Sequence, residues 1–319
     1  MDTVAPLAVG SADVISQFIV ASLVSAPFDW FLNVADVVFS WVAEVTGLEF
    51  LAYPYMQRAY LSVLAIGIVG PLVGSFLVYR DLSMVGDTLA HTAFAGVAAA
   101  LFLEATVALT VPPLVGALVV ATIAALVVQA LVEYTGARSD AALAMVLTGG
   151  FALGSVLISL TDGGISVGIN QYLFGSLATV SRADVGLLVS MTLVVVTAVS
   201  VAYRPLLYVT FDETSARASR VHVRAVNTLL SILTAFVVVS AMRIMGVILV
   251  AALLVIPVVT ATHLGRSYKQ SLVYGVLAGE VAGVVGVTLA YLYGLAAGGS
   301  IVMVALAGFV AVQLVRRFS

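Results

Sequence analysis

The chain has 319 residues, of which 62% are apolar and only 9% are charged, with 13 basic and 16 acidic side chains. A soluble domain carries roughly 25% charged residues, so this chain has more apolar surface than a soluble fold can bury. The formal net charge of −3 argues against a nucleic-acid partner, which requires a basic surface. The absence of cysteine excludes disulfides and thiolate metal sites. The composition predicts an all-α, polytopic transmembrane helical bundle.

The first 53 residues contain two apolar stretches, 14–27 and 30–43, separated by Asp29. Each stretch is shorter than the ~20 residues that cross a bilayer as a helix. We therefore expect residues 1–53 to form an N-terminal extension that lies at the membrane surface. One additional span in this region is the alternative.

From residue 54 onward the apolar runs are long enough to cross a bilayer, which predicts a membrane domain over 54–319 with about eight to ten spans. The pair 226–242 and 244–263 is compatible with one bent unit, but the break at Arg243-Ile244-Met245-Gly246 favours two helices. The segments assigned as spans are 55–79, 87–105, 109–133, 141–161, 184–203, 226–242, 244–263, 271–293 and 298–315.

Basic residues orient these spans, because the cytoplasmic loops of membrane proteins are enriched in Lys and Arg. Nine spans that start outside place ten of the 13 basic residues on the cytoplasmic side. This arrangement predicts a multi-pass protein of the cell membrane with a cytoplasmic C-terminus. The ten residues are Arg80, Arg138, Arg204, Arg217, Arg220, Arg224, Arg266, Lys269, Arg316 and Arg317.

The segment 163–182 is interrupted by Gly168 and Asn170 and does not read as a full span. We expect a short re-entrant or surface helix there, which is tolerated where protein covers it or where it lines a cavity. Asn170 is therefore a candidate polar residue of a transport pathway. Glu280 is another, because it lies in the middle of a predicted span. The alternative for Glu280 is a carboxyl group hydrogen-bonded to a neighbouring helix.

The most informative ionisable pair in a span is Asp87 and His91. Residues four apart share one face of a helix, with Cβ atoms about 5–6 Å apart. A carboxylate and an imidazole at this spacing can bind one divalent metal ion such as Zn²⁺ or Mn²⁺. The spacing is equally compatible with a structural interpretation, in which Asp87 caps the helix after Gly86 and His91 bonds to a backbone carbonyl.

The longest loop on the predicted cytoplasmic side, 204–225, contains a candidate short helix. Asp212 or Thr214 can cap it, with acidic residues in its first turn and arginines near its end, as the helix dipole favours. Such a helix between spans suits docking to a cytoplasmic partner, and the alternative is a solvated connector. The residues that would carry the docking are Asp212, Glu213, Ala216, Arg217 and Arg220.

Sequence signatures of common enzymes are missing: there is no G-x-x-x-x-G-K-[ST] phosphate loop, no H-E-x-x-H pair and no G-x-S-x-G elbow. We therefore expect a protein that is not itself an enzyme and that binds no permanent cofactor. Without a phosphate loop, the chain cannot hydrolyse ATP by that route.

Four ordered motifs within 54–315 resemble the permease subunit of zinc, manganese and iron ABC importers, the ABC-3 family. They are Gly74-Ser75-Phe76-Leu77-Val78-Tyr79-Arg80 with Gly86-Asp87-Thr88-Leu89-Ala90-His91, Tyr172-Leu173-Phe174-Gly175, Asp212 to Arg220, and Gly246 to Thr262 with Pro257.

The resemblance implies a homodimeric permease that works with two cytoplasmic ATP-binding subunits and an extracellular metal-binding protein. It implies a pathway metal site at Asp87 and His91 and a coupling helix at 212–220. The sequence departs from the family pattern at Ala95, where many members have proline, and at Gly294, where many have aspartate.

Three other functions stay open. An ABC permease for a metal chelate, such as a siderophore or cobalamin, would favour a wide pathway without an Asp and His pair. A secondary metal transporter driven by ions would need more membrane carboxylates. In a non-transporting scaffold, Asp87 and His91 would be structural. Zinc, manganese and iron all remain candidate cargoes, because Asp with His accepts each of these ions.

Overall fold

The structure, a computed structural model, describes residues 11–107, 111–135, 139–161, 172–173, 175 and 180–318. All regular structure in these ranges is helical, which confirms the predicted all-α fold. Contacts divide the chain into two units, Met1–Gln57 and Arg58–Ser319. The predicted re-entrant or surface helix at 163–182 lies mostly outside the described residues, and so does Asn170.

The N-terminal unit contains the long helix α1 (Ser11–Thr46) and the short 3₁₀ helix η1 (Glu49–Ala52). The two apolar stretches 14–27 and 30–43 thus belong to one helix, which continues through Asp29. Gly47 ends α1 in the left-handed conformation (φ +71°), and its N–H donates to the carbonyl oxygen of Ala43 at 2.9 Å. A stripe of exposed apolar side chains follows α1 at helical spacing and suits the membrane surface that the sequence predicts. These side chains are Trp30, Val34, Val37, Trp41 and Val45.

Nine helices of the described chain correspond, in order, to the nine predicted spans. Eight of them are long and apolar enough to cross a membrane. The ninth, α11, has 16 residues and rises about 24 Å, which is less than the ~30 Å of a bilayer core. The nine are α2 (Pro54–Val78), α3 (Met84–Val107), α4 (Pro113–Thr135), α5 (Ser139–Ser159), α7 (Arg182–Val201), α10 (Val223–Met245), α11 (Val247–Thr262), α12 (Tyr268–Tyr293) and α13 (Ala297–Phe318).

The break between α10 and α11 lies at Gly246, whose φ of +85° is a conformation that only glycine adopts easily. The prediction of two helices rather than one bent unit is confirmed. Gly175, with a φ of +71°, packs against this break, and a Cβ atom on it would overlap the carbonyl oxygen of Ile244. One of the four sequence motifs therefore touches another, at the end of α10.

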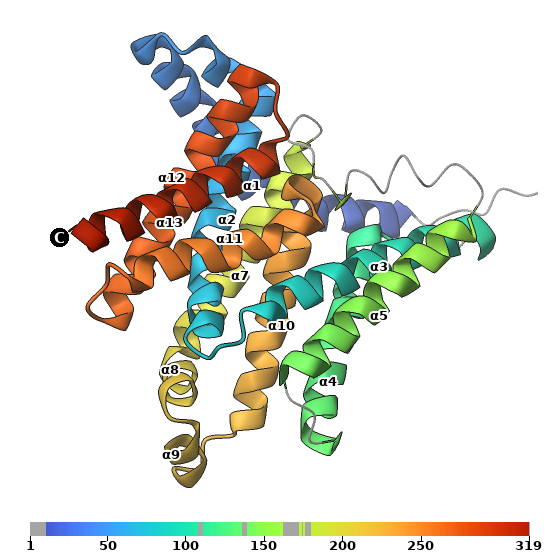
Figure 1. The fold of residues 1–319 in the computed structure, drawn as a ribbon. Helices are drawn as coiled ribbons and strands as arrows, with labels where there is room; N and C mark the ends of the chain where they lie inside the picture. Colours follow the sequence, from blue (N-terminus) through green and yellow to red (C-terminus); the bar gives the residue numbers. More distant parts are fainter. Residues whose placement is uncertain are drawn as a thin grey trace, which may run out of the picture. The chain divides into compact units, whose positions relative to one another are not determined.

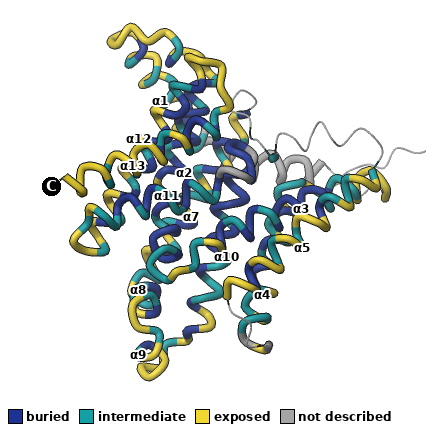
Figure 2. The backbone as a smooth tube through the Cα atoms, viewed as in Figure 1, coloured by how far each residue is buried: buried dark blue, intermediate teal, exposed yellow. Residues whose placement is uncertain are grey.

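Within the Arg58–Ser319 unit, α3 packs beside α4 and α5, and α12 packs beside α11 and α13 (Figure 1). The α10 helix touches both groups, through α3 and α4 on one side and α11 on the other. Buried residues fill most of α2 and α10, whereas most residues of α4, α5 and α13 are outside the core (Figure 2). The exposed apolar faces of these outer helices are available to lipid or to another protein chain.

Glycines allow several of these helices to approach closely. A Cβ atom on Gly74 of α2 would overlap the carbonyl oxygen of Leu254 in α11. On α12, a Cβ atom on Gly279 would lie 3.1 Å from the carbonyl oxygen of Gly67, and one on Gly283 would overlap the side chain of Val63. The backbone of α2 is therefore in close contact with both α11 and α12.

Candidate metal pair and coupling helix

Asp87 and His91 occupy the first two turns of α3. Oδ1 of Asp87 lies 3.5 Å from Nε2 of His91, so the two side chains share one face of the helix, as their spacing predicts. The Asp87 side chain is 41% exposed and that of His91 is 21% exposed. The pair therefore lies at the edge of the packed core, where an ion can reach it.

The ring of His91 is held by α5. It meets Phe151 edge-on, with ring centroids 5.5 Å apart, and Phe151 stacks on Phe94 at 5.8 Å. The Nδ1 atom of His91 is buried and has no hydrogen-bond partner among the described residues. The described residues thus offer Nδ1 no backbone carbonyl of the kind that the structural interpretation requires.

Two threonines beside the pair pack α3 against α5, one through its hydroxyl group and one through its methyl group. Oγ1 of Thr88 donates to the carbonyl oxygen of Leu143 in α5 at 3.3 Å. Oγ1 of Thr92 donates to the carbonyl oxygen of Thr88 at 3.0 Å, and Thr92 packs where Gly150 of α5 leaves room for it. Both threonines are buried. They fix the position of α3 and leave Asp87 and His91 as the polar groups of its accessible face.

The pair supplies only part of a metal site. Among the described residues, no group of three or more His, Cys, Asp and Glu side chains could hold a metal ion together. Structural zinc sites take about four ligands, and manganese prefers about six. Any further ligands at Asp87 and His91 have to be water molecules or groups from another chain.

The predicted cytoplasmic helix is formed. It consists of α9 (Glu213–Ala218), which follows α8 (Tyr203–Phe211). Asp212, rather than Thr214, is its cap: Oδ1 of Asp212 accepts a hydrogen bond from the N–H of Ser215 at 2.8 Å. Hydrogen bonding with Ser215 holds the pKa of Asp212 below its ordinary value. The helix ends with Arg220 in the left-handed conformation (φ +59°).

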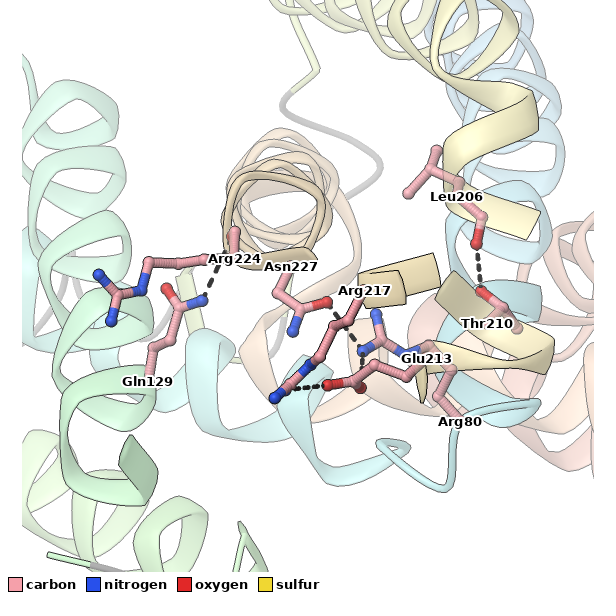
Figure 3. A network of polar contacts seen from close by, with 8 residues as sticks. All are labelled: Arg80, Gln129, Leu206, Thr210, Glu213, Arg217, Arg224 and Asn227. Carbon is pink, nitrogen blue, oxygen red and sulfur yellow. Dashed lines mark hydrogen bonds and ion pairs between the residues drawn. The ribbon is translucent and has the colours of Figure 1, made fainter. Parts of the chain in front are cut away.

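A buried arginine ties α9 to the membrane helices (Figure 3). The Arg80 side chain, in the turn between α2 and α3, is 9% exposed. Its Nη2 atom donates to Oδ1 of Asn227 in α10 at 2.8 Å and lies 3.7 Å from Oε2 of Glu213, which also pairs with Arg217. Burial lowers the pKa of Arg80, while the charge of Glu213 acts in the opposite direction. Because a buried guanidinium is costly without its partners, this network fixes α9 against the α2–α3 turn.

The two alanines of α9 face in different directions. Ala216 is fully buried against the chain itself, whereas Ala218 is exposed. The free face of α9 therefore carries Thr214, Arg217 and Ala218 rather than Ala216. Sequence reasoning grouped Ala216 with the docking residues because a helix this short gives no clear apolar face.

A cavity of about 800 Å³ opens beside α9. It is lined by Arg80 in the α2–α3 turn, by Arg217 of α9, and by residues of α2, α3, α4, α5, α8 and α10. Val85 lines this cavity, but neither Asp87 nor His91 does. Residues two apart on a helix point about 200° apart, so Asp87 faces away from it. The cavity belongs to the polar network around α9 and not to the candidate metal pair.

Two further ionisable residues of the predicted spans lie elsewhere. Glu280 lies against Gly67 of α2 and does not join Asp87 and His91 in a group of metal ligands. His263 contacts α13, with Nδ1 3.2 Å from Nη1 of Arg316. Sequence reasoning did not find the bond between Arg80 and Asn227, because the two residues are far apart in the chain. The only signal was an arginine at the end of a predicted span.

Comparisons with known proteins agree with this architecture. The model of the ABC 3 transport family matches residues 52–316. The manganese transport system membrane protein MntC of Halalkalibacterium halodurans is 31% identical over 257 residues, which are 81% of this chain and 86% of that protein. The manganese import system permease protein ScaB of Streptococcus gordonii is 29% identical over 251 residues, covering 79% of this chain and 87% of ScaB.

A solved structure has the same fold. PsaBC from Streptococcus pneumoniae in complex with Fab superposes with a TM-score of 0.74 at 29% sequence identity, covering 85% of this chain and 95% of that chain. The residues matched by the family model include Asp87, His91 and α9. The chain is therefore a multi-pass membrane protein that belongs to the ABC 3 transport family.

Proposed function

We propose that this chain is the membrane-spanning permease of an ATP-driven importer for a divalent transition-metal ion, with manganese as the first candidate cargo and zinc and iron as the others. Family membership and relatives named as manganese transport proteins support this assignment. The observation that carries it is a carboxylate and an imidazole 3.5 Å apart on the accessible face of a membrane helix. Ionisable side chains within membrane-spanning helices carry a free-energy cost, and they usually have functional roles.

The pathway site forms from two copies of the chain. A two-fold axis beside α3 brings together two copies of Asp87 and two of His91, which supplies about four ligands. The carboxylates offset the charge of the ion, while water completes its coordination. Such a site binds the ion without holding it for long, as conduction through a membrane requires.

ATP hydrolysis takes place in separate cytoplasmic subunits, and an extracellular metal-binding protein delivers the cargo. The free face of α9, with Thr214, Arg217 and Ala218, docks onto the ATP-binding subunit. Arg80 then passes movement of α9 to the turn that begins α3, because it contacts Glu213 and precedes Asp87 by only seven residues.

The test is metal uptake into vesicles that contain the permease, its ATP-binding subunit and its metal-binding protein. Element analysis with Mn²⁺, Zn²⁺ and Fe²⁺ offered together should show ATP-dependent accumulation of at least one free ion. Accumulation driven by an ion gradient without ATP would contradict the proposal. So would uptake of metal chelates in the absence of any uptake of free ions.

A further inference from the structure

Glu280 is a carboxyl group in the interior of a membrane helix. It lies near the middle of α12, between Gly279 and Gly283, the two glycines through which this helix contacts α2. Both of its carboxylate oxygens are buried. Neither has a hydrogen-bond partner among the residues that the structure describes.

The helices packed around Glu280 provide no cation to balance a negative charge. The sequence of α11 has no ionisable residue, and α13 has none before Arg316. On α2 the ionisable residues are Tyr55, Arg58 and Tyr60. Tyr55 and Arg58 lie twelve and nine residues from Gly67, about 18 Å and 13 Å along the helix, and Tyr60 is bonded to Thr288. On α12 itself, Lys269 is eleven residues away, or about 16 Å. A bare carboxylate in this position would carry a large desolvation penalty, and such groups become neutral instead.

Glu280 faces α2 at a backbone carbonyl oxygen that has no N–H donor from its own helix. A Cβ atom on Gly67 of α2 would lie 2.8 Å from Oε1 of Glu280, so the carboxyl group occupies the space that the glycine leaves. Pro71, four residues further along α2, has no N–H and cannot donate the helical hydrogen bond to the carbonyl of Gly67. That carbonyl oxygen faces α12, 3.1 Å from the position of a Cβ on Gly279.

We propose that Glu280 is a proton-binding site of the membrane domain. The side chain is held as the carboxylic acid, and its O–H donates to the Gly67 carbonyl that Pro71 leaves without a helical donor. One bound proton thereby joins α12 to α2 at the proline. A metal ion is excluded as the occupant because a single carboxylate and one carbonyl, among glycines and apolar side chains, offer too few ligands.

The first test is chemical. Dicyclohexylcarbodiimide enters membranes and reacts with protonated carboxyl groups, whereas carboxylates in water, with pKa values of about 4, are ionised at about pH 7. The full-length protein in lipid vesicles is treated at neutral pH and mapped by peptide mass spectrometry. Glu280 should be labelled, while Asp140 and Glu213, which lie near the ends of helices, should not. The Glu280→Gln variant is the negative control, because this peptide then lacks the carboxyl group at position 280.

The second test needs no reagent to reach the site. Glu280→Gln keeps an N–H donor of the same shape, so its Tm in detergent should equal that of the wild type, and Glu280→Ala should lower the Tm. Gly67→Ala should also lower it, because the new methyl group displaces the carboxyl group. The double variant Gly67→Ala, Glu280→Ala should be more stable than Gly67→Ala alone.

A Glu280→Gln variant as unstable as Glu280→Ala would overturn the proposal, because the native group would then be an ionised carboxylate. Additive effects in the double variant would overturn the contact with Gly67.

Discussion

At the scale of single residues, the strongest expectation concerns metal uptake and the two polar side chains on the accessible face of α3. Asp87→Asn and His91→Gln keep the size of each side chain but remove a ligand. Loss of a direct metal ligand should reduce metal uptake by more than the ~10- to 100-fold that is typical when a residue hydrogen-bonded to a ligand is lost. The measurement is element analysis of vesicles, with assembly of the permease and its ATP-binding subunit checked by size-exclusion chromatography.

The control for these variants is Asp140→Asn, which removes an exposed carboxylate from the first turn of α5. It should leave uptake unchanged, which separates the loss of a ligand from the loss of one negative charge. Normal uptake by both Asp87→Asn and His91→Gln would show that the pair is structural.

At the scale of an element, α9 offers a matched pair of substitutions. Ala218→Trp adds bulk to the exposed face, so it should leave the Tm of the isolated permease unchanged and uncouple uptake from ATP hydrolysis. Ala216→Trp adds the same bulk to a fully buried position and should overpack the chain itself, at a cost of about 1–3 kcal/mol. Tm measurements on the permease alone, followed by uptake and ATPase assays on the complex, distinguish the two. Wild-type coupling in Ala218→Trp would make α9 a simple connector.

The close contact between α2 and α11 requires a glycine at position 74, because a side chain there would overlap the backbone of α11. Gly74→Ala would place a methyl group into the carbonyl of Leu254, and because backbone cannot move aside cheaply, we expect a loss of about 1–3 kcal/mol. In α5, a Cβ atom on Gly149 meets nothing within 4 Å. Gly149→Ala should therefore be neutral or gain about 0.5–1 kcal/mol from helix propensity. Thermal unfolding of the two variants checks this difference, and equal effects would contradict the close approach.

At the scale of the whole molecule, nine alternating spans and their basic loops predict which helix ends share a side of the membrane. The native chain has no cysteine, so single cysteines report this directly. Cysteines at Arg217 and Arg316 should react with a membrane-impermeant thiol reagent only after the membrane is opened. Cysteines at Glu104 and Leu295 should react in intact cells. Labelling of position 217 from outside would invert the orientation.

The properties that the sequence alone determined are those set by solvent and by local backbone bonds. Span positions follow from apolar length, because a bilayer of fixed thickness demands about 20 apolar residues per helix. The break at Gly246, a cap for α9 at Asp212 or Thr214 and the shared face of Asp87 and His91 each depend on a few neighbouring residues. A pattern within one or two helical turns is sufficient to predict each of them.

The tertiary structure decided everything that depends on which segments lie opposite one another. A helix as short as α9 shows no clear apolar face in the sequence, so Ala216 was not recognised as inward-facing. The bond from Arg80 to Asn227 and the contact of Glu280 with Gly67 join residues 147 and 213 positions apart. In a membrane, apolar side chains suit lipid and protein equally, so close packing and scarce polar groups select the partners, and both act only between folded helices.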